Sequence, residues 1–321
     1  MKFIFEPLLK SRHNVICVDG AFEAKLQLSH WHGNSSPHEL KADTTTQMAF
    51  KLIEHPGKQR FLEGIEIVSN NHYDADGVLS AFVILNPEYS LRHKKDLINI
   101  ALTGDFAEFT TEDALKANSV IESFTDEEKS IFKDILTREN YPSAMQKIYL
   151  KAFEIIPSLI SEIDKHEKIW LDEWNSFRES CSSFSTRESV VSNYGDCNLS
   201  VVESSFPLHI VSKFANTEND ILLSVVKSKL GNAYELEYKF WTWFDTIRPK
   251  KFKRRSFETL AQKLNQIETN KTGSWKVVGR DPVSEWNYRL VFAVEDYKPA
   301  PSSLKVYEVE NILFENLPKS F

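Results

Sequence analysis

Cysteine is scarce in this sequence of 321 residues: only Cys17, Cys181 and Cys197 occur, and no two have the short spacing of a metal-binding pair. This pattern argues against a disulfide framework and against a cysteine zinc site. Long apolar runs are also missing, since the longest, such as Val78–Leu85, fall far short of the ~20 residues that span a bilayer. The N-terminal run Met1–Glu6 is interrupted by an acidic residue, unlike a signal peptide. We therefore expect a soluble, cytoplasmic protein that does not bind membranes.

An excess of positive charge is absent as well. The chain has 39 lysines and arginines against 46 aspartates and glutamates, so its formal net charge is −7. This balance argues against a protein that wraps duplex DNA by bulk electrostatics. Hydrophobic residues make up 41% of the chain and aromatic residues 12%, which excludes a disordered or fibrous protein. The length fits two ordinary domains.

Strands and helices alternate in the first part of the chain. The runs Asn14–Val18 and Gly64–Ser69 are short, apolar and followed by turn residues, which predicts buried strands. A helix is expected from the cap residues after Asp43 to Ile53, and a second helix covers Val78–Leu85. This order is typical of an α/β fold with a parallel sheet, in which loops gather at the strand ends.

The pattern changes twice further along the chain. From Arg92 to Cys181 the apolar residues recur at helical spacing, and Ser182–Asp196 has the serine- and asparagine-rich composition of a linker. Beyond it we predict strands at Leu199–Glu203, Ile221–Ser228 and Tyr234–Phe244, and a helix at Phe257–Ile267. We therefore predict an α/β domain over residues 1–188, with a helical segment, and a smaller α+β domain over residues 189–321.

The most informative residues are His72, Asp74 and Asp76, which directly follow a predicted strand. If the chain stays extended there, the three side chains share one face. Two carboxylates so close raise each other's pKa unless a cation neutralises them, and oxygen with imidazole ligands suits an ion such as Mn²⁺. The alternatives are solvated loop residues or an EF-hand calcium loop, although the glutamate of an EF-hand is missing and a strand precedes the loop. Gly77 would permit a tight turn into a helix whose N-terminus can bind an anion.

The sequence His-Tyr-Asp-Ala-Asp-Gly-x-x-Ser at residues 72–80 resembles the first motif of the DHH phosphoesterase superfamily. That superfamily includes RecJ-type exonucleases, oligoribonuclease-like phosphodiesterases, exopolyphosphatases and manganese pyrophosphatases. The resemblance implies a DHH-like parallel-sheet domain whose site commonly holds two manganese ions. Residues Ala101–Phe106 resemble a later motif, in which a glycine-containing turn delivers Asp105 as a further ligand. No DHH triplet occurs in the sequence.

Two segments can replace that triplet. Upstream, Val15–Gly20 resembles the strand that ends in a bridging aspartate, here Asp19, and Ser29–Asn34 stands where the histidine motif does. This assignment makes the motifs circularly permuted, which is structurally inexpensive when chain termini lie at the surface. The alternative, Asp164–His166, keeps the usual order but lies in a strongly helical stripe. We prefer the permuted order. The upstream segment is also similar to an uncharacterised bacterial family of unknown function.

Carried over residue by residue, the resemblance implies a two-metal site with Mn²⁺ as the ion and Mg²⁺ as an alternative. One ion would be held by His72 and Asp74, the other by Asp76, His30 and Asp105, with Asp19 bridging the two. A water molecule between the ions would attack phosphorus in line. The candidate catalytic residues are His32 and Asp76, and Asn34 is a candidate for binding the substrate.

A basic run, Arg248–Arg255, stands out in this acidic protein. Such a run is commonly a solvated surface. The resemblance offers another role, because the C-terminal domain of DHH enzymes closes over the site and contributes basic groups. Since arginine forms bidentate contacts with phosphate, the substrate-binding candidates are Arg248, Arg254 and Arg255. Trp241 and Trp243 could stack on a base, or form part of the sheet core.

The leading hypothesis is a Mn²⁺-dependent phosphohydrolase or phosphodiesterase. Its partner would be a nucleotide, another small phosphorylated substrate or a short single-stranded oligonucleotide. The absence of a P-loop, a GxSxG nucleophile elbow and an HExxH motif argues against several other enzyme classes. The rival hypothesis is a non-catalytic protein that keeps a DHH-like fold and binds a nucleotide or phosphorylated ligand. A third is a structural protein whose acidic residues lie far apart.

Overall fold

The computed structural model describes residues 1–248 and 253–317. The chain divides into two units: unit 1 comprises Met1–Asn175 and Phe244–Pro249, and unit 2 comprises Ser176–Trp243 and Lys250–Phe321. The division falls inside helix α9 (Glu167–Thr186), earlier than the predicted boundary at residue 188. No helix in the described part of the chain is both long and apolar enough to cross a membrane.

The predicted linker Ser182–Asp196 is instead the end of α9 followed by strand β5 (Val190–Tyr194). The hydroxyl groups of the serine-rich end donate to carbonyls of the preceding turn, so these polar side chains are satisfied within the helix. Ser183 Oγ donates to Ser180 O at 2.7 Å, and Thr186 Oγ1 donates to Ser182 O at 3.2 Å. Composition alone therefore did not reveal that this segment is helix and strand.

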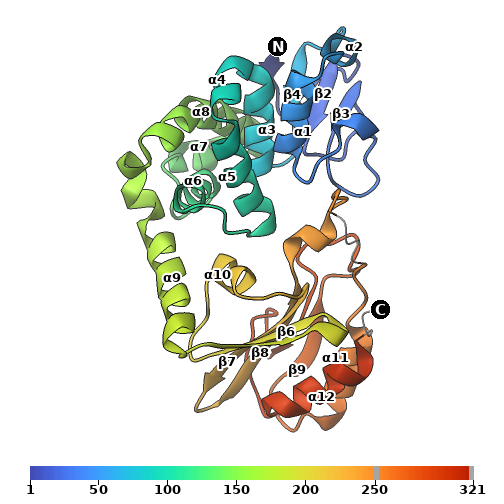
Figure 1. Cartoon of the computed structure of the whole chain (residues 1–321), viewed down its shortest axis with the longest axis vertical. Coiled ribbons are helices and arrows are strands. Elements are labelled where there is room, and N and C mark those ends of the chain that lie inside the picture. The colour runs from blue at the N-terminus through green and yellow to red at the C-terminus, as the bar shows by residue number, and fades with distance from the viewer. Residues whose placement is uncertain (249–252, 318–321) are drawn as a thin grey trace. The chain divides into compact units, whose positions relative to one another are not determined.

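Unit 1 combines short strands with many helices (Figure 1). Its strands are β1 (Lys2–Phe3), β2 (Val15–Val18), β3 (Leu26–Leu28) and β4 (Ile67–Ser69). Its α-helices are α1 (Thr45–Glu54), α2 (Lys58–Leu62), α3 (Ala75–Leu85), α4 (Pro87–Arg92), α5 (Lys94–Phe106), α6 (Glu112–Ser123), α7 (Lys133–Arg138) and α8 (Tyr141–Ser161), and its 3₁₀ turns are η1 (Glu6–Leu8), η2 (His38–Leu40) and η3 (Ile163–His166).

The strands of unit 1 form a four-stranded parallel sheet in the order β1-β4-β2-β3. Strand β2 therefore lies between β4 and β3. Its side chains alternate between two apolar faces, as strand geometry requires. Ile16 and Val18 pack into the large core formed with the helices, whereas Val15 and Cys17 pack against Phe22 on the other side. Because the strands are parallel, their carboxyl ends share one edge of the sheet.

Unit 2 contains the rest of the described elements. Its strands are β5, β6 (Leu199–Ser204), β7 (Ile221–Ser228), β8 (Gly231–Tyr238), β9 (Ser274–Val278), β10 (Arg289–Ala293) and β11 (Pro301–Ser302). Its helices are α10 (Ile210–Ala215), α11 (Glu258–Ile267) and α12 (Val306–Asn316), with 3₁₀ turns η4 (Gly195–Cys197) and η5 (Phe240–Trp243). The strands form a mixed seven-stranded sheet in which β6 and β7 are parallel and the other pairs antiparallel.

The predicted strand Tyr234–Phe244 is shorter than expected. Strand β8 ends at Tyr238, and the chain turns into η5 because Thr242 donates both its N–H and its hydroxyl to Lys239 O, at 3.1 and 2.6 Å. Trp241 and Trp243 therefore lie outside the sheet. Within β8, the side chains of Tyr234, Leu236 and Tyr238 recur at every second residue and are buried in the unit 2 core, which also contains residues of α11 and α12.

Arg254 is an interior residue of unit 2, only 4% exposed. Its guanidinium donates to Thr242 Oγ1 at 2.9 Å and to the carbonyls of Glu285 and Trp286 at 3.2 and 2.9 Å. Burial lowers its pKa to about 10. Its neighbour Arg255 is exposed, and residues 249–252 of the basic run lie outside the described residues. The basic run therefore does not form one solvated surface. Arg254 is buried and connects η5 with the carbonyls of Glu285 and Trp286.

We predict that Arg254→Ala lowers the free energy of unfolding by about 1–3 kcal/mol, because buried carbonyl and hydroxyl groups lose their donor. Urea titration of the full chain measures this change. Arg255→Ala is the matched control, and it should change the free energy by less than about 0.5 kcal/mol. Equal effects of the two substitutions would contradict the interior role of Arg254.

Candidate metal centre

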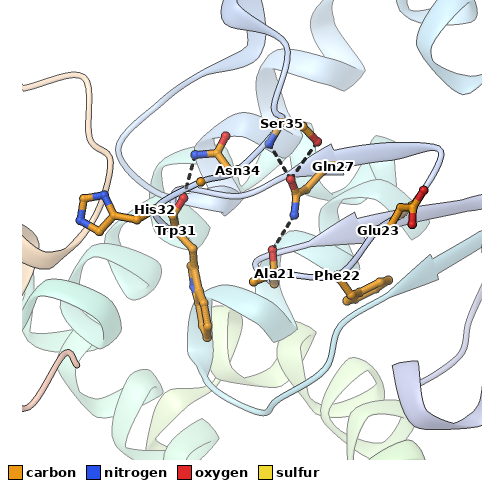
Figure 2. Close-up of a pocket in the computed structure, with 11 residues that line it drawn as sticks. Ala21, Phe22, Glu23, Gln27, Trp31, His32, Asn34 and Ser35 are labelled. Carbon is orange, nitrogen blue, oxygen red and sulfur yellow. Dashed lines mark hydrogen bonds between the residues drawn. The ribbon is translucent and has the colours of Figure 1, made fainter. Parts of the chain in front are cut away.

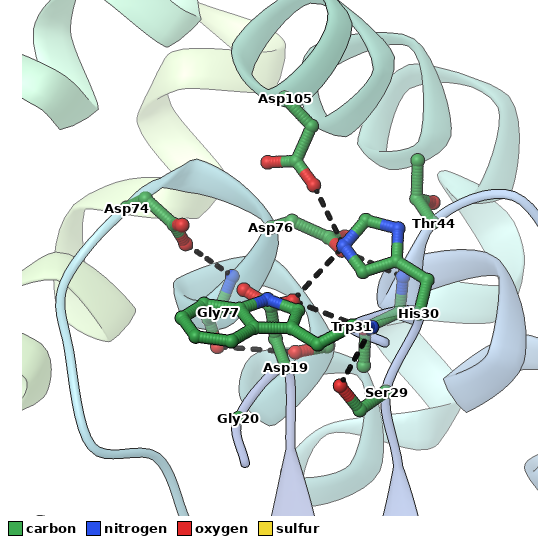
Figure 3. A network of polar contacts seen from close by, with 12 residues as sticks. Asp19, Gly20, Ser29, His30, Trp31, Thr44, Asp74, Asp76, Gly77 and Asp105 are labelled. Carbon is green, nitrogen blue, oxygen red and sulfur yellow. Dashed lines mark hydrogen bonds and ion pairs between the residues drawn. The ribbon is translucent and has the colours of Figure 1, made fainter. Parts of the chain in front are cut away.

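Three strand ends bring polar side chains together at the carboxyl edge of the unit 1 sheet. Asp19 directly follows β2, His30 lies just beyond β3, and His72 lies just beyond β4. Because β2 is between β3 and β4, Asp19 is placed between the two histidines. Its Oδ1 is 3.1 Å from His30 Nε2, a pair drawn in Figure 3. Its Oδ2 is 3.3 Å from His72 Nε2. The strand order thus makes Asp19 the shared residue.

Asp19 has a left-handed backbone conformation, with φ of 46°. Such a conformation costs a non-glycine residue about 1–3 kcal/mol and persists where the surrounding structure holds it. Here the Asp19 N–H donates to Leu28 O at 2.8 Å, which ties the turn to the neighbouring strand.

The stretch from His72 to Asp76 does not stay extended, so the condition for one shared face is not met. Helix α3 begins at Ala75, with Asp74 as its N-cap accepting a hydrogen bond from Gly77 N at 2.8 Å. Asp74 Oδ2 also lies 2.8 Å from His72 Nε2. Asp76 is in the first turn of the helix and is fully buried. The cap therefore separates Asp74 and Asp76 into different surroundings.

The N-terminus of α1 holds the Asp76 carboxylate. The backbone N–H groups of Thr45 and Thr46 donate to its two oxygens at 2.6 and 2.7 Å. The Thr45 hydroxyl donates to Asp19 Oδ1 at 3.2 Å. A helix N-terminus carries partial positive charge, so it offsets part of the cost of burying Asp76. Thr44 caps the helix as the sequence predicted, in a capping box with Gln47.

Asp105 is delivered by a helix rather than by the predicted glycine turn. It lies in the last turn of α5, where its Oδ2 is 3.1 Å from His30 Nε2. Gly104 has a packing role, because a Cβ atom there would lie 2.8 Å from both Ala75 Cβ and Asn118 Oδ1. Glycine thus lets α5 approach the start of α3, which brings Asp105 to the cluster.

The structure brings together all six residues that the sequence nominated as metal ligands. They form two overlapping sets in which the ligand atoms lie within 4.8 Å of one another. The first set contains Asp19, His30, Asp76 and Asp105, and the second contains Asp19, His72 and Asp74. Asp19 belongs to both sets. This partition is the one that the resemblance implied.

Both histidines present Nε2 to carboxylates. His30 Nδ1 lies 2.5 Å from Asp43 O, and His72 Nδ1 lies 3.1 Å from Asn71 Oδ1. A carbonyl oxygen can only accept, so each Nδ1 carries a proton and each Nε2 is turned toward the cluster. Metal-binding histidines are commonly oriented in this way.

Three buried atoms of the cluster, Asp19 Oδ2, His30 Nε2 and Asp105 Oδ2, form no hydrogen bond of good geometry among the described residues. They do lie close to oppositely charged partners, with His30 Nε2 3.1 Å from Asp105 Oδ2 and His72 Nε2 3.3 Å from Asp19 Oδ2. An unsatisfied buried polar atom is costly, and a buried carboxylate more so. A cation in contact with these atoms would satisfy all three. The donor set of carboxylate oxygens and imidazole nitrogens fits a divalent ion such as Mn²⁺.

The pKa values show how strongly the cluster requires positive charge. Burial raises the pKa of Asp76 to about 7, with the Asp19 charge adding to the effect, and burial likewise raises the pKa of Asp105. Burial also opposes ionisation of Asp19, yet the nearby imidazoles of His30 and His72 outweigh it and lower the Asp19 pKa. In the histidines, burial is outweighed by the facing carboxylates, which raise both pKa values. Without a cation, protons hold the cluster together.

A pocket of about 400 Å³ lies beside the cluster, lined by residues 20–24, Gln27 and residues 31–35 (Figure 2). Gln27 braces its wall, donating to Gly20 O at 3.0 Å and accepting from Ser35 N at 2.6 Å. Asn34 is also engaged in the loop, donating to Trp31 O at 2.8 Å. His32 is exposed at this pocket, belongs to neither ligand set, and extends away from the Trp31 indole (Figure 2).

The alternative ligands Asp164 and His166 belong to neither set. Both lie in η3, where His166 Nε2 is 2.8 Å from Ser158 Oγ and partial burial lowers the His166 pKa. Of the predicted substrate-binding arginines, Arg248 belongs to unit 1 and donates to Asp43 Oδ2 at 3.3 Å and Glu108 Oε2 at 2.6 Å. Arg254 and Arg255 belong to unit 2.

Sequence reasoning missed the residues that orient the ligands. Asn71 and the carbonyl of Asp43 hold the two histidine rings, and Phe244 stacks on His30 with ring centroids 4.0 Å apart. Asn71 is next to a nominated ligand, so its amide could have been considered. Nothing in the sequence connects Phe244 with His30, because only the folded chain brings them together.

The family model for DUF6687, described as a family of unknown function, matches residues 1–312. No curated protein matches the sequence significantly. The match covers nearly the whole chain, including every residue of both ligand sets.

We predict that Mn²⁺ binds more tightly as the pH rises from about 6 to 8, across the raised Asp76 pKa of about 7. At low pH, protons on Asp76, Asp105 and the histidines compete with the ion. Raising the pH removes those protons, so the apparent affinity increases. Calorimetric titration in buffers of different ionisation enthalpy measures the protons released. The control is Asp164→Ala, which lies outside both ligand sets and should show the same change of Mn²⁺ affinity with pH. A Mn²⁺ affinity that does not change with pH would contradict the prediction.

Proposed function

Since the chain belongs to the family of unknown function DUF6687, we propose its function from its own site: a Mn²⁺-dependent phosphohydrolase or phosphodiesterase acting on a small phosphorylated substrate. The observation that carries the proposal is the convergence of three unsatisfied buried atoms, on Asp19, His30 and Asp105, in one acidic cluster. Such a cluster is stable only with added positive charge. Divalent cations are the chemistry that this donor set suits best.

Two cations fit better than one because the ligand sets overlap only at Asp19. His30, Asp76 and Asp105 would hold one ion, His72 and Asp74 would hold the other, and Asp19 would contribute to both sets. When bound, two divalent ions activate water for attack on phosphorus and neutralise the charge that develops on the phosphoryl oxygens.

The residues of this chain prepare the site before any ligand arrives. The α1 N-terminus fixes both oxygens of Asp76, and Asp43 and Asn71 fix the rings of His30 and His72. The ligand atoms are therefore held by groups that cannot easily reorient. Preorganisation of this kind is what electrostatic catalysis requires, because the cost of orienting the dipoles has already been met in folding.

The pocket beside the cluster provides room for the rest of the substrate. Its volume of about 400 Å³ is within the range of small-molecule sites, which supports a nucleotide or another small phosphorylated compound. Trp31 lines this pocket, and its ring lies 5.0 Å from the ring of His72. His32 lines the same pocket and is the candidate proton donor to the leaving oxygen. Asn34 is a candidate for shaping the pocket wall and contacting the substrate.

The test uses the full chain with Mn²⁺ and an aryl phosphodiester such as bis(p-nitrophenyl) phosphate. We expect Mn²⁺-dependent hydrolysis, and a loss of roughly 100-fold or more in both metal affinity and rate in the double variant Asp74→Ala plus Asp76→Ala. The expected losses follow because each ligand set loses one carboxylate. Asp164→Ala is the matched control and should change neither quantity.

Retention of both metal and hydrolysis in the double variant would sink the proposal. A chain that binds Mn²⁺ and is stabilised by nucleotides, yet turns over neither the diester nor the nucleotides, would instead support the non-catalytic binding protein. Thermal unfolding with and without nucleotide measures that stabilisation, because a ligand that binds only the native state raises its apparent stability.

A further inference from the structure

A short segment from late in the sequence closes around His30. We call residues 244–248 the strap. They belong to unit 1, although the chain that precedes them, up to Trp243, belongs to unit 2. The Phe244 ring stacks on the His30 imidazole, with centroids 4.0 Å apart and planes 29° apart. The backbone of the next residue continues the contact, since Asp245 N donates to His30 O at 2.6 Å.

The strap also holds the residue that orients His30. Asp43 O accepts from His30 Nδ1, while the Asp43 carboxylate accepts from Ile247 N at 3.0 Å and Arg248 Nε at 3.3 Å. Asp43 thus links the strap to the proton-bearing side of the imidazole. Because Asp43 is held at both carboxylate oxygens, its backbone has little freedom to move away from His30.

The strap reaches the helix end that carries Asp105 as well. The Arg248 guanidinium lies over the Phe106 ring, 4.8 Å from its centroid, and donates to Glu108 Oε2 at 2.6 Å. Phe106 in turn packs edge-on to Phe244, with centroids 5.3 Å apart. One segment therefore contacts both His30 and Phe106, the residue that directly follows Asp105 of the first ligand set.

Further ion pairing anchors the strap to unit 1. Asp245 Oδ2 accepts from Lys41 Nζ at 2.7 Å and from Asn34 Nδ2 at 3.3 Å. Asn34 belongs to the same loop as His30. Asp245 thus joins the strap to the loop that contains His30 and Asn34. Asp43 joins the strap to the start of α1.

We infer that the strap is the positioning element that sets the cation affinity of the His30-containing ligand set, an inference that rests on the proposed metal site. It acts on His30 through ring stacking, a backbone hydrogen bond and the Asp43 carbonyl. These contacts hold Nε2 toward Asp19 and Asp105, which is the orientation a cation needs. The consequence is that metal loading at this position depends on a segment contributed from far along the chain.

The decisive variant is Phe244→Ala, studied in the full chain by Mn²⁺ titration with the free ion followed by electron paramagnetic resonance. We expect one of the two Mn²⁺ affinities to fall by about 10–100-fold, as when a group that orients a ligand is removed. The other affinity, at the set with His72 and Asp74, should stay within about twofold. Phe244→Tyr keeps the ring and should bind like the wild type.

Phe61→Ala is the matched control. Phe61 is also a half-buried phenylalanine of unit 1 that packs against a histidine, since its ring lies edge-on to His55 with centroids 5.3 Å apart. His55 belongs to neither ligand set. Loss of ring packing alone should therefore leave both Mn²⁺ affinities unchanged in this variant.

A second variant keeps the inference testable if Phe244→Ala does not fold. Arg248→Lys retains the charge but replaces the planar donor that bridges Asp43 and Glu108 with a point charge. We expect a smaller loss at the same Mn²⁺ position. Arg60→Lys is its control, because Arg60 also pairs with a carboxylate, Glu39 at 2.6 Å, and lies over a ring, that of Phe61 at 4.6 Å.

Unchanged Mn²⁺ isotherms in folded Phe244→Ala and Arg248→Lys would overturn the inference, as would equal weakening of both positions. Either result leaves the proposed hydrolase intact. Conversely, a wild-type chain that binds two Mn²⁺ ions but hydrolyses nothing would refute the hydrolase only. A wild-type chain that binds no Mn²⁺ would refute both.

Discussion

Mutual repulsion of buried carboxylates is the constraint on which the rest of unit 1 depends. Asp19, Asp76 and Asp105 share one space from which water is largely excluded, and Asp74 lies beside it. The free-energy cost of burying unpaired charges there would be comparable to the whole free energy of unfolding of a small domain. The fold reduces this cost with the α1 N-terminus at Asp76 and with the imidazoles of His30 and His72. The unsatisfied atoms that are left are the basis of the cation site that we propose.

The order of the strands explains why these groups meet. With β2 between β3 and β4, one aspartate after β2 faces a histidine from each neighbour. Helices complete the cluster, and their approach depends on small local features. Gly104 removes the side chain that would keep α5 from the start of α3, and the Asp74 cap starts that helix one residue before Asp76 joins it. The strap then holds His30 through the Phe244 ring and the Asp245 N–H. Each feature lies in a different part of the chain, yet all act on the same few atoms.

Local sequence patterns predicted much of this arrangement. The run Val15–Val18, the threonine-rich helix start before α1 and the helix after Asp76 all have short-range signals, because capping and apolar periodicity act within a few residues. Where local signals conflict with packing, the prediction is wrong. A glycine before Asp105 suggested a turn, but packing against α3 requires glycine inside a helix. Serines after Cys181 suggested a linker, but their hydroxyls bond back to the helix. Arg254 looked like surface charge because burial cannot be read from a charge run.

By itself, the sequence determined several strands and helices of unit 1, the scarcity of cysteine and the identity of the acidic and histidine residues that gather near the strand ends. The alternation of apolar and polar residues, helix capping and side-chain chemistry depend only on residues close together in the sequence, so they can be recognised without the structure. Only the tertiary structure decided that Asp19 stands between two histidines, that Asp76 is held by α1 rather than aligned with Asp74, and that Phe244 covers His30. These facts depend on strand order and on contacts between segments far apart in the chain. No short-range pattern encodes such contacts, because they arise only when the whole unit has packed.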